Sequence, residues 1–312
     1  MNIRIFFPFF KRAYFRTLFI FLLIFFVGCS NSNNREKMDV ELFLENVMIR
    51  ERGLYVLMGT KPMSTFNLDS GFPESEEERK SYYHRRLNEW KEENSLEPCE
   101  SYEEFSKNCE KQPHSHHQRL WKAWQEQMGS YVSPRYLFVT RKAPFGDRRE
   151  DGLFINVPST IYVLKSNYAS FSKITGMGFD PDTILKELSH DESLFWERAF
   201  QSHYLGGLLY GYGEKNAVCF EWEIKNECAV PLMRIADHPT IDQTVDIFSK
   251  KNVTLADLKL PLFGVYSLDD PTIKKYKREK EYILKELKGK DFYQTVVKWL
   301  SEKEPPSTRF IN

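Results

Sequence analysis

Apolar residues recur every three or four positions along much of the chain, which is the spacing of a helix with one buried face. This spacing predicts helices over residues 39–50, 271–288 and 292–300. Asp39 and Asp270 stand where a side-chain oxygen would cap the first two helices, and Gly289 follows the second. Residues 74–94 carry acidic residues first and basic residues later, an order that suits a helix dipole. The chain is therefore predicted to be rich in helix.

Two short sequences have the pattern of a capping box, Ser-x-x-Gln or Ser-x-x-Glu. The first, at 115–118, predicts a helix that ends at Gly129. Its apolar stripe comprises His117, Leu120, Trp121, Trp124 and Met128. The second, at 189–192, predicts a helix to about residue 212 that is apolar nearly all round and hence buried. Its glycines, Gly206, Gly207 and Gly211, predict that a neighbouring backbone comes close.

The remaining patterns are shorter. Asp180-Pro181 predicts a helix to residue 188, and length favours helix over strand for 214–225. Short helices are also expected over 240–250 and 255–258. Runs typical of strands cover 54–58, 135–140, 152–157 and 160–164. The last three predict a small antiparallel sheet that the first can join. The predicted fold class is α+β, a helix-rich single globular domain with a small antiparallel sheet, over residues 39–304.

The N-terminal residues differ from the rest. Arg4, Lys11, Arg12 and Arg16 occur without an acidic residue, and residues 17–28 are almost wholly apolar. As a helix this run would span about 18 Å, well short of a hydrocarbon core of about 30 Å. This is the layout of a signal peptide. An ordinary cleaved signal peptide and an uncleaved anchor extended back through residues 6–10 are the alternatives.

The apolar run closes on Gly28-Cys29-Ser30, which resembles the lipobox of bacterial lipoproteins. Phe26 stands where that family usually has Leu. The resemblance implies cleavage before Cys29, acyl chains on Cys29, and outer-membrane sorting directed by Ser30. The expected organisation is a signal peptide over 1–28, a polar tether over 29–38, the domain, and a C-terminal tail over 305–312.

Three further segments are similar to a family of uncharacterised bacterial envelope proteins. They are LYVLMGTKPM at 54–63, HYLGGLLYGYGEKNA at 203–217 and LPLFGVYSLDDPTI at 260–273. No activity is known for that family, so the resemblance implies an address and no chemistry.

Charge is balanced, with 44 basic and 44 acidic residues, and removing residues 1–28 leaves a net charge of −4. There is no basic stripe interleaved with aromatic residues and no nucleic-acid motif. We therefore expect no nucleic-acid partner. The expected partners are the membrane, through the N-terminal lipid, and other envelope proteins.

Four cysteines remain after Cys29, and an oxidising compartment would allow three pairings among them. Proximity favours Cys99 with Cys109 and Cys219 with Cys228; free, buried thiols are the alternative. Cys109, His114, His116 and His117 are of types that bind zinc or copper, but their spacing matches no recognised zinc pattern. A polar helix start is the simpler interpretation of these histidines, and we expect no metal and no cofactor.

Ser170 and Lys173 form S-x-x-K, the nucleophile motif of penicillin-binding enzymes, in which the lysine takes the proton of the serine. The other motifs of that family have candidates only at Asn167 and residues 173–176, which crowd around the motif itself. His203 is expected to be a hydrogen-bonded core residue.

The sequence thus predicts a lipid-anchored protein of the cell envelope, held at the outer membrane and facing the periplasm. It is expected to bind or scaffold rather than to catalyse. The alternative is an envelope hydrolase, serine- or metal-dependent, that acts on peptidoglycan or peptides.

Overall fold

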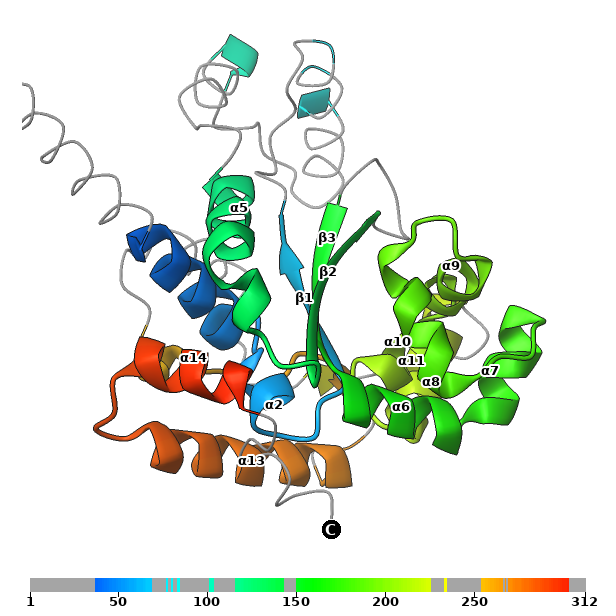
Figure 1. Ribbon diagram of the computed structural model, residues 1–312. Coiled ribbons are helices and arrows are strands. Elements are labelled where there is room, and N and C mark those ends of the chain that lie inside the picture. The colour runs from blue at the N-terminus through cyan, green and yellow to red at the C-terminus, as the bar shows by residue number, and fades with distance from the viewer. Residues whose placement is uncertain are drawn as a thin grey trace, which may run out of the picture.

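A three-stranded antiparallel sheet lies between two groups of helices (Figure 1). The computed structural model describes residues 37–68, 77, 80, 83–84, 101–103, 116–142, 150–225, 233–234, 254–265, 267 and 269–302. The strands are β1 (Met63–Asn67), β2 (Tyr136–Lys142) and β3 (Glu150–Asn156), in the spatial order β1-β3-β2. The fold is therefore helix-rich α+β with a small antiparallel sheet, as predicted.

Both faces of the sheet are buried because successive side chains of each strand point to opposite sides. Phe154 of β3 lies between Ser64 of β1 and Phe138 of β2 in the register, and it faces the first core together with Phe138. Its neighbours Leu153 and Ile155 face the second core. The alternation along β3 therefore joins two separate hydrophobic clusters through one strand.

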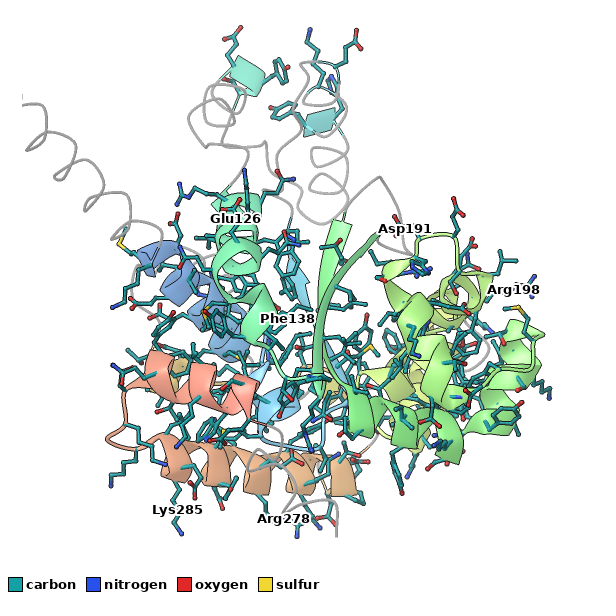
Figure 2. All side chains as sticks on the ribbon, viewed as in Figure 1. Glu126, Phe138, Asp191, Arg198, Arg278 and Lys285 are labelled. Atoms are coloured by element: carbon teal, nitrogen blue, oxygen red, sulfur yellow. The ribbon has the colours of Figure 1, made fainter. Side chains whose placement is uncertain are left out.

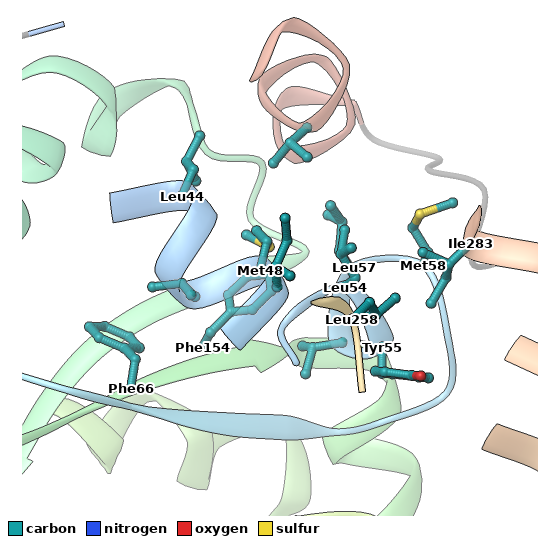
Figure 3. Packing of buried hydrophobic residues seen from close by; sticks show 14 of the residues in the cluster. Leu44, Met48, Leu54, Tyr55, Leu57, Met58, Phe66, Phe154, Leu258 and Ile283 are labelled. Atoms are coloured by element: carbon teal, nitrogen blue, oxygen red, sulfur yellow. The ribbon is translucent and has the colours of Figure 1, made fainter. Parts of the chain in front are cut away.

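The first core is formed by the N-terminal and C-terminal helices. Its elements are the helix over 37–45, its π-helical continuation η1 (Asn46–Arg50), α2 (Leu54–Leu57), α5 (His116–Met128), α13 (Pro271–Leu287) and α14 (Phe292–Ser301). Figure 3 shows Met48, Leu57 and Phe154 packed together at its centre. The rings of Phe138 and Phe154 stack with centroids 4.5 Å apart, and Phe43 stacks on Trp124 at 5.4 Å. Contacts between aromatic side chains thus connect the first helix, through α5, to the sheet.

The second core is formed by consecutive short helices on the opposite face of the sheet. They are α6 (Val157–Ser166), α7 (Tyr168–Thr175), α8 (Pro181–Ile184), η3 (Leu185–Ser189), α9 (Leu194–Gln201), α10 (His203–Leu209) and α11 (Glu214–Ile224). Further short elements are η2 (Gly129–Tyr131), β4 (Met233–Arg234), η4 (Leu255–Asp257) and β5 (Gly264–Val265). β4 and β5 pair with each other as a separate two-stranded sheet.

Several predicted elements are confirmed. Asp270 caps α13 by accepting from the amide of Thr272, and Gly289 follows that helix with φ +72°. Asp180 caps α8 in the same way, α5 and α14 lie where the hydrophobic spacing predicted them, and α11 is the helix that length favoured for 214–225. Residues 255–257 form the 3₁₀-helix η4. Local caps and a single apolar stripe therefore determined these helices.

Two predicted strands are wrong. Residues 54–57 form the helix α2, which is buried on every side, so its apolar run carries no periodicity that separates helix from strand. β1, rather than residues 54–58, is the strand that joins β2 and β3 in the sheet. Residues 160–164 lie in α6, where Asn156 accepts from the amide of Ser159 and Pro158 occupies the first turn. The cap and the proline outweigh the β-branched residues that suggested a strand.

The predicted helix from 189 to about 212 is also wrong in part. The chain there forms α9 and α10, separated at Ser202, whose hydroxyl accepts from the amide of Leu205. The segment before α9 is held by Arg141 of β2, which is 6% exposed and donates to the carbonyls of Leu188, His190 and Ser193 at 3.1–3.3 Å. The buried guanidinium of Arg141 thus binds carbonyls of the residues at which the capping box was expected to start a helix.

Some predictions fall outside the described residues. They concern the helices over 74–94 (apart from isolated residues) and 240–250, the signal peptide, most of the tether, and the tail. Within the part of the chain that is described, no helix combines the length and the apolar character needed to cross a membrane.

Gly207 and Gly206 offer a matched test of the contact between α10 and α11. A Cβ on Gly207 would lie 2.7 Å from the Cβ of Ala217, whereas a Cβ on Gly206 has its nearest neighbour at 4.0 Å. We expect Gly207→Ala to lower the free energy of unfolding by about 1–3 kcal/mol through overpacking. Gly206→Ala should leave it unchanged or raise it by up to about 1 kcal/mol, because alanine restricts the unfolded chain. Urea denaturation of both variants checks this; equal effects would contradict the close contact.

Candidate functional site

Polar side chains gather where the three segments at 54–63, 203–217 and 260–273 meet. Lys61 lies after α2, Tyr210 and Tyr212 follow α10, and Phe263 stacks on Tyr212 with centroids 5.1 Å apart. A Cβ on Gly211 would lie 3.6 Å from the side chain of Lys61, and Gly211 has φ +76°. Segments far apart in sequence thus enclose one lysine.

Lys61 is almost completely removed from solvent, with 5% of its surface exposed. Its Nζ donates a hydrogen bond to the carbonyl of Met63 and lies 5.7 Å from the centre of the Tyr210 ring. Burial lowers the pKa of Lys61 to about 7, and the positive charge of Arg52 acts in the same direction while Glu51 opposes it. The amine therefore exchanges its proton near neutral pH.

The phenols around Lys61 are held in their neutral form. Burial raises the pKa of Tyr212 to about 12, and it raises the pKa values of Tyr210 and Tyr276 as well. The hydroxyl of Tyr276 donates to the carbonyl of Gly211 at 2.8 Å. This bond ties α13 to the turn that covers Lys61.

Arg52 connects the end of η1 to the third segment. It is the non-glycine residue with positive φ, +62°, in the described part of the chain. Its Nε donates to the carbonyl of Leu260 at 2.9 Å, and its Nη1 donates to the carbonyl of Arg50 at 3.0 Å. The unusual backbone conformation therefore accompanies a contact that spans most of the chain.

Glu279 of α13 anchors the loop that carries Lys61. Its Oε1 accepts from the amide of Thr60 at 3.2 Å and from the hydroxyl of Thr60 at 2.7 Å. Its Oε2 has no hydrogen-bond partner among the described residues, and a Cβ on Gly59 would lie 2.3 Å from it. Burial raises the pKa of Glu279, and Lys275 opposes the shift. The carboxyl group thus fixes the loop at the point where Gly59 permits close approach.

This anchor gives a direct prediction. Glu279→Ala leaves the amide and hydroxyl of Thr60 without an acceptor, so we expect it to lower the free energy of unfolding by about 2–3 kcal/mol. Glu279→Gln keeps an oxygen for Thr60 and should change it by less than about 1 kcal/mol. Urea denaturation at pH 7 measures both. Equal losses would mean that the side chain acts through its charge rather than through Thr60.

The two S-x-x-K residues, Ser170 and Lys173, lie in the same helix, α7. Lys173 is exposed and makes no hydrogen bond to Ser170 in the part of the molecule that is described, while the Ser170 hydroxyl pairs with that of Tyr204 at 3.5 Å. Asn167 accepts from the amide of Phe171 through its carbonyl, at the junction of α6 and α7. The geometry does not direct Lys173 at Ser170.

The proposed metal and disulfide residues fall mainly where nothing is described. Cys99, Cys109, Cys228 and His114 lie outside the described residues, as does Cys29. His116 and His117 are placed in the first turn of α5, without a description of their side chains. Cys219 is a free, buried thiol. No group of three or more metal-binding side chains occurs among the described residues. Cys219 is thus in the free, buried form that was the alternative to its pairing with Cys228, and the pairing of Cys99 with Cys109 stays a prediction.

His203 is half-buried at the start of α10, and its ring lies edge-on to Phe220 at 5.4 Å. It is therefore more open to solvent than the predicted core histidine.

The sequence reasoning missed Lys61, Glu279 and Arg141. A signal existed for two of them. Glu279 falls between Tyr276 and Ile283 on the inner stripe of α13, and Arg141 continues the alternation of Leu137 and Val139 on one face of β2. A charged residue at an apolar position of a periodic pattern marks a buried polar contact. Lys61 carries no such mark.

The fold and this site define a helix-rich α+β domain with a buried polar junction, which we call the Lys61 junction: Arg52, Thr60, Lys61, Tyr210, Tyr212, Tyr276 and Glu279. Comparisons with protein-family models, curated proteins and solved structures find no match. The resemblances to bacterial lipoproteins and to envelope proteins therefore stay predictions.

Proposed function

We propose that the protein is a lipid-anchored module of the bacterial cell envelope that acts by binding or scaffolding other envelope components. The observation that carries the proposal is the order of residues 1–30: basic residues, a short apolar run, and Gly28-Cys29-Ser30. Acyl chains on Cys29 would hold the domain at a bilayer at about 0.8 kcal/mol per buried CH₂. Ser30 supports a location at the outer membrane, with the domain in the periplasm.

Exposed apolar side chains on the second helical layer support a binding role. Trp222 and Ile224 near the end of α11 are 43% and 49% exposed, and Tyr162 of α6 is 67% exposed. Tryptophan and tyrosine are enriched among the residues that dominate binding at protein interfaces. The Lys61 junction is buried within the protein, so a partner that contacts this layer would leave it covered.

The intact mass of the mature protein, extracted in detergent without reductant, tests the anchor. We expect a chain that begins at Cys29 and is heavier than its sequence by the mass of the acyl groups. Each disulfide would lower the mass by two hydrogens. Cys29→Ala should abolish the acylation, so that the acylated mature chain is no longer formed. An unmodified chain, or one that begins elsewhere, would refute the lipid anchor.

A photoreactive residue at position 222 tests the binding role in cells. We expect crosslinks to an envelope component from position 222 and none from position 186, an exposed lysine on η3. Equal crosslinking at both positions, or none at 222, would argue against a binding surface around Trp222.

A further inference from the structure

The outer face of α13 carries an unusual excess of positive charge. Residues 271–290 include eight basic and three acidic residues, although the whole chain is balanced. At about 100° per residue, Lys274, Lys277, Arg278, Lys285 and Lys288 fall within an arc of about 100°. Glu281 is the acidic residue of that arc. We call these five basic residues the α13 basic face.

The basic face points away from both cores. Figure 2 shows Arg278 and Lys285 extending outward from α13, on the side opposite the sheet. Lys277, Arg278, Lys285 and Lys288 are exposed, and none has a carboxylate partner among the described residues. The other two acids of the segment are engaged elsewhere: Glu279 with Thr60, and Glu286 with Lys290 at 3.6 Å. Lys274 pairs with Asp269 at 2.6 Å, so the charge that is not neutralised within the described structure is that of the other four basic residues.

The first helix of the domain lies near α14, the helix that follows α13 (Figure 1). Glu41 of the first helix is close enough to Tyr293, in the first turn of α14, to raise its pKa together with burial. α14 begins directly after α13, and Tyr293 packs on the same core as Val40 and Leu44. Seven residues separate Cys29 from Lys37, and the eight steps along the chain span at most about 29 Å. A lipid on Cys29 would therefore allow the basic face to reach the bilayer.

We propose that the α13 basic face binds the anionic phospholipid headgroups of the membrane to which the protein is anchored. An anionic surface attracts each nearby lysine or arginine, and acyl anchors are commonly reinforced by basic residues of this kind. The contact would orient the domain on the membrane, with α13 toward the lipid and the helices α6–α11 further from it. This inference rests on the proposed lipid anchor.

Amine labelling of the mature full-length protein in vesicles tests the contact. The vesicles contain phosphatidylcholine alone or mixed with anionic phosphatidylglycerol, and labelled lysines are located by mass spectrometry. We expect Lys277, Lys285 and Lys288 to react about fivefold more slowly in the anionic vesicles. High salt should remove the difference. Lys173 and Lys186, exposed on the second layer, should react equally in both.

Charge reversal provides the matched variants. Lys277→Glu with Lys285→Glu should abolish the protection of Lys288, whereas Lys173→Glu with Lys186→Glu should retain it. Equal labelling of α13 in both vesicle types would overturn the proposal. Protection that is independent of lipid charge would also overturn it, because it would mean that a protein covers the face.

The failures of the two proposals are distinguishable. If the mass shows no acyl group but protection still depends on anionic lipid, the basic face stands and the anchor falls. If the mass confirms acylation and protection is absent, the anchor stands and the basic face falls.

Discussion

Lys61→Met should remove a rise in stability that the wild-type protein shows between pH 7 and about pH 9.5. The folded protein holds Lys61 at a pKa of about 7, whereas the ordinary lysine pKa, which an unfolded chain has, is 10.5. Between these values the unfolded state binds more protons, so the free energy of unfolding increases with pH by about 1 kcal/mol per unit. The penalty for burying the charged amine is fully present below pH 7 and fades above it.

Other buried groups set the limits of this measurement. The tyrosines of the Lys61 junction have raised pKa values, so their contribution to stability is lost only as the pH rises through 10. The lowered pKa of Lys275 adds to the slope in wild type and variant alike. Burial raises the pKa of Glu51, so the folded state binds its proton more tightly than the unfolded chain. As the pH rises from acidic values, Glu51 therefore lowers the free energy of unfolding, the opposite of the effect of Lys61. The difference between wild type and variant reports Lys61 together with its effect on Glu51, whose pKa the charge of Lys61 lowers.

Urea denaturation of wild type, Lys61→Met and Lys173→Met at several pH values provides the measurement. Lys173 is exposed on α7, so its replacement should leave the pH dependence unchanged. We expect the curve for Lys61→Met to be flatter by about 1 kcal/mol per pH unit. Parallel curves for all three proteins would show that the amine of Lys61 stays charged in the folded state.

Arg141→Met is expected to destabilise the helical layer of the second core strongly. It would leave the carbonyls of Leu188, His190 and Ser193 without their buried donor, at a cost of about 3–5 kcal/mol in total. The guanidinium also lies 5.9 Å from the centre of the Phe200 ring. Hydrogen exchange should show the loss first in α9, next to the released segment.

Arg141→Lys is the matched variant for this test. A single ammonium group cannot reach three carbonyls in a fixed fork, so we expect an intermediate loss of about 1–3 kcal/mol. A loss as small as that of a surface substitution in both variants would show that water replaces the guanidinium in this loop.

Local chemistry explains which elements could be predicted. Helices that begin at a capping aspartate and expose one face, such as α13 after Asp270, are determined by residues within one turn. α2 and α6 could not be separated from strands by their apolar runs, because tertiary burial and the Asn156 cap decide their conformation. The break at Ser202 depends on a cap inside an apolar stretch, which periodicity alone does not distinguish from a continuous helix.

The Lys61 junction was beyond local reasoning for a different reason. Its members lie up to 227 positions apart, between Arg52 and Glu279. No spacing rule relates Lys61 to the turn at Gly211 or Thr60 to α13. Their environment exists only when α2, α10 and α13 are packed together, so the pKa of Lys61 is a property of the whole fold.

The central position of β3 bears on how this chain folds. β2 and β3 are separated by residues 143–149 and can pair as a local hairpin, whereas β1 joins β3 across residues 68–149. Closing that long loop is a slow step, so we expect β1 docking to limit the folding rate. Each doubling of a flexible loop costs only about 0.6 kcal/mol of closure entropy. The stretch between β1 and α5 is therefore where the protein could gain or lose whole segments of chain while keeping the same sheet.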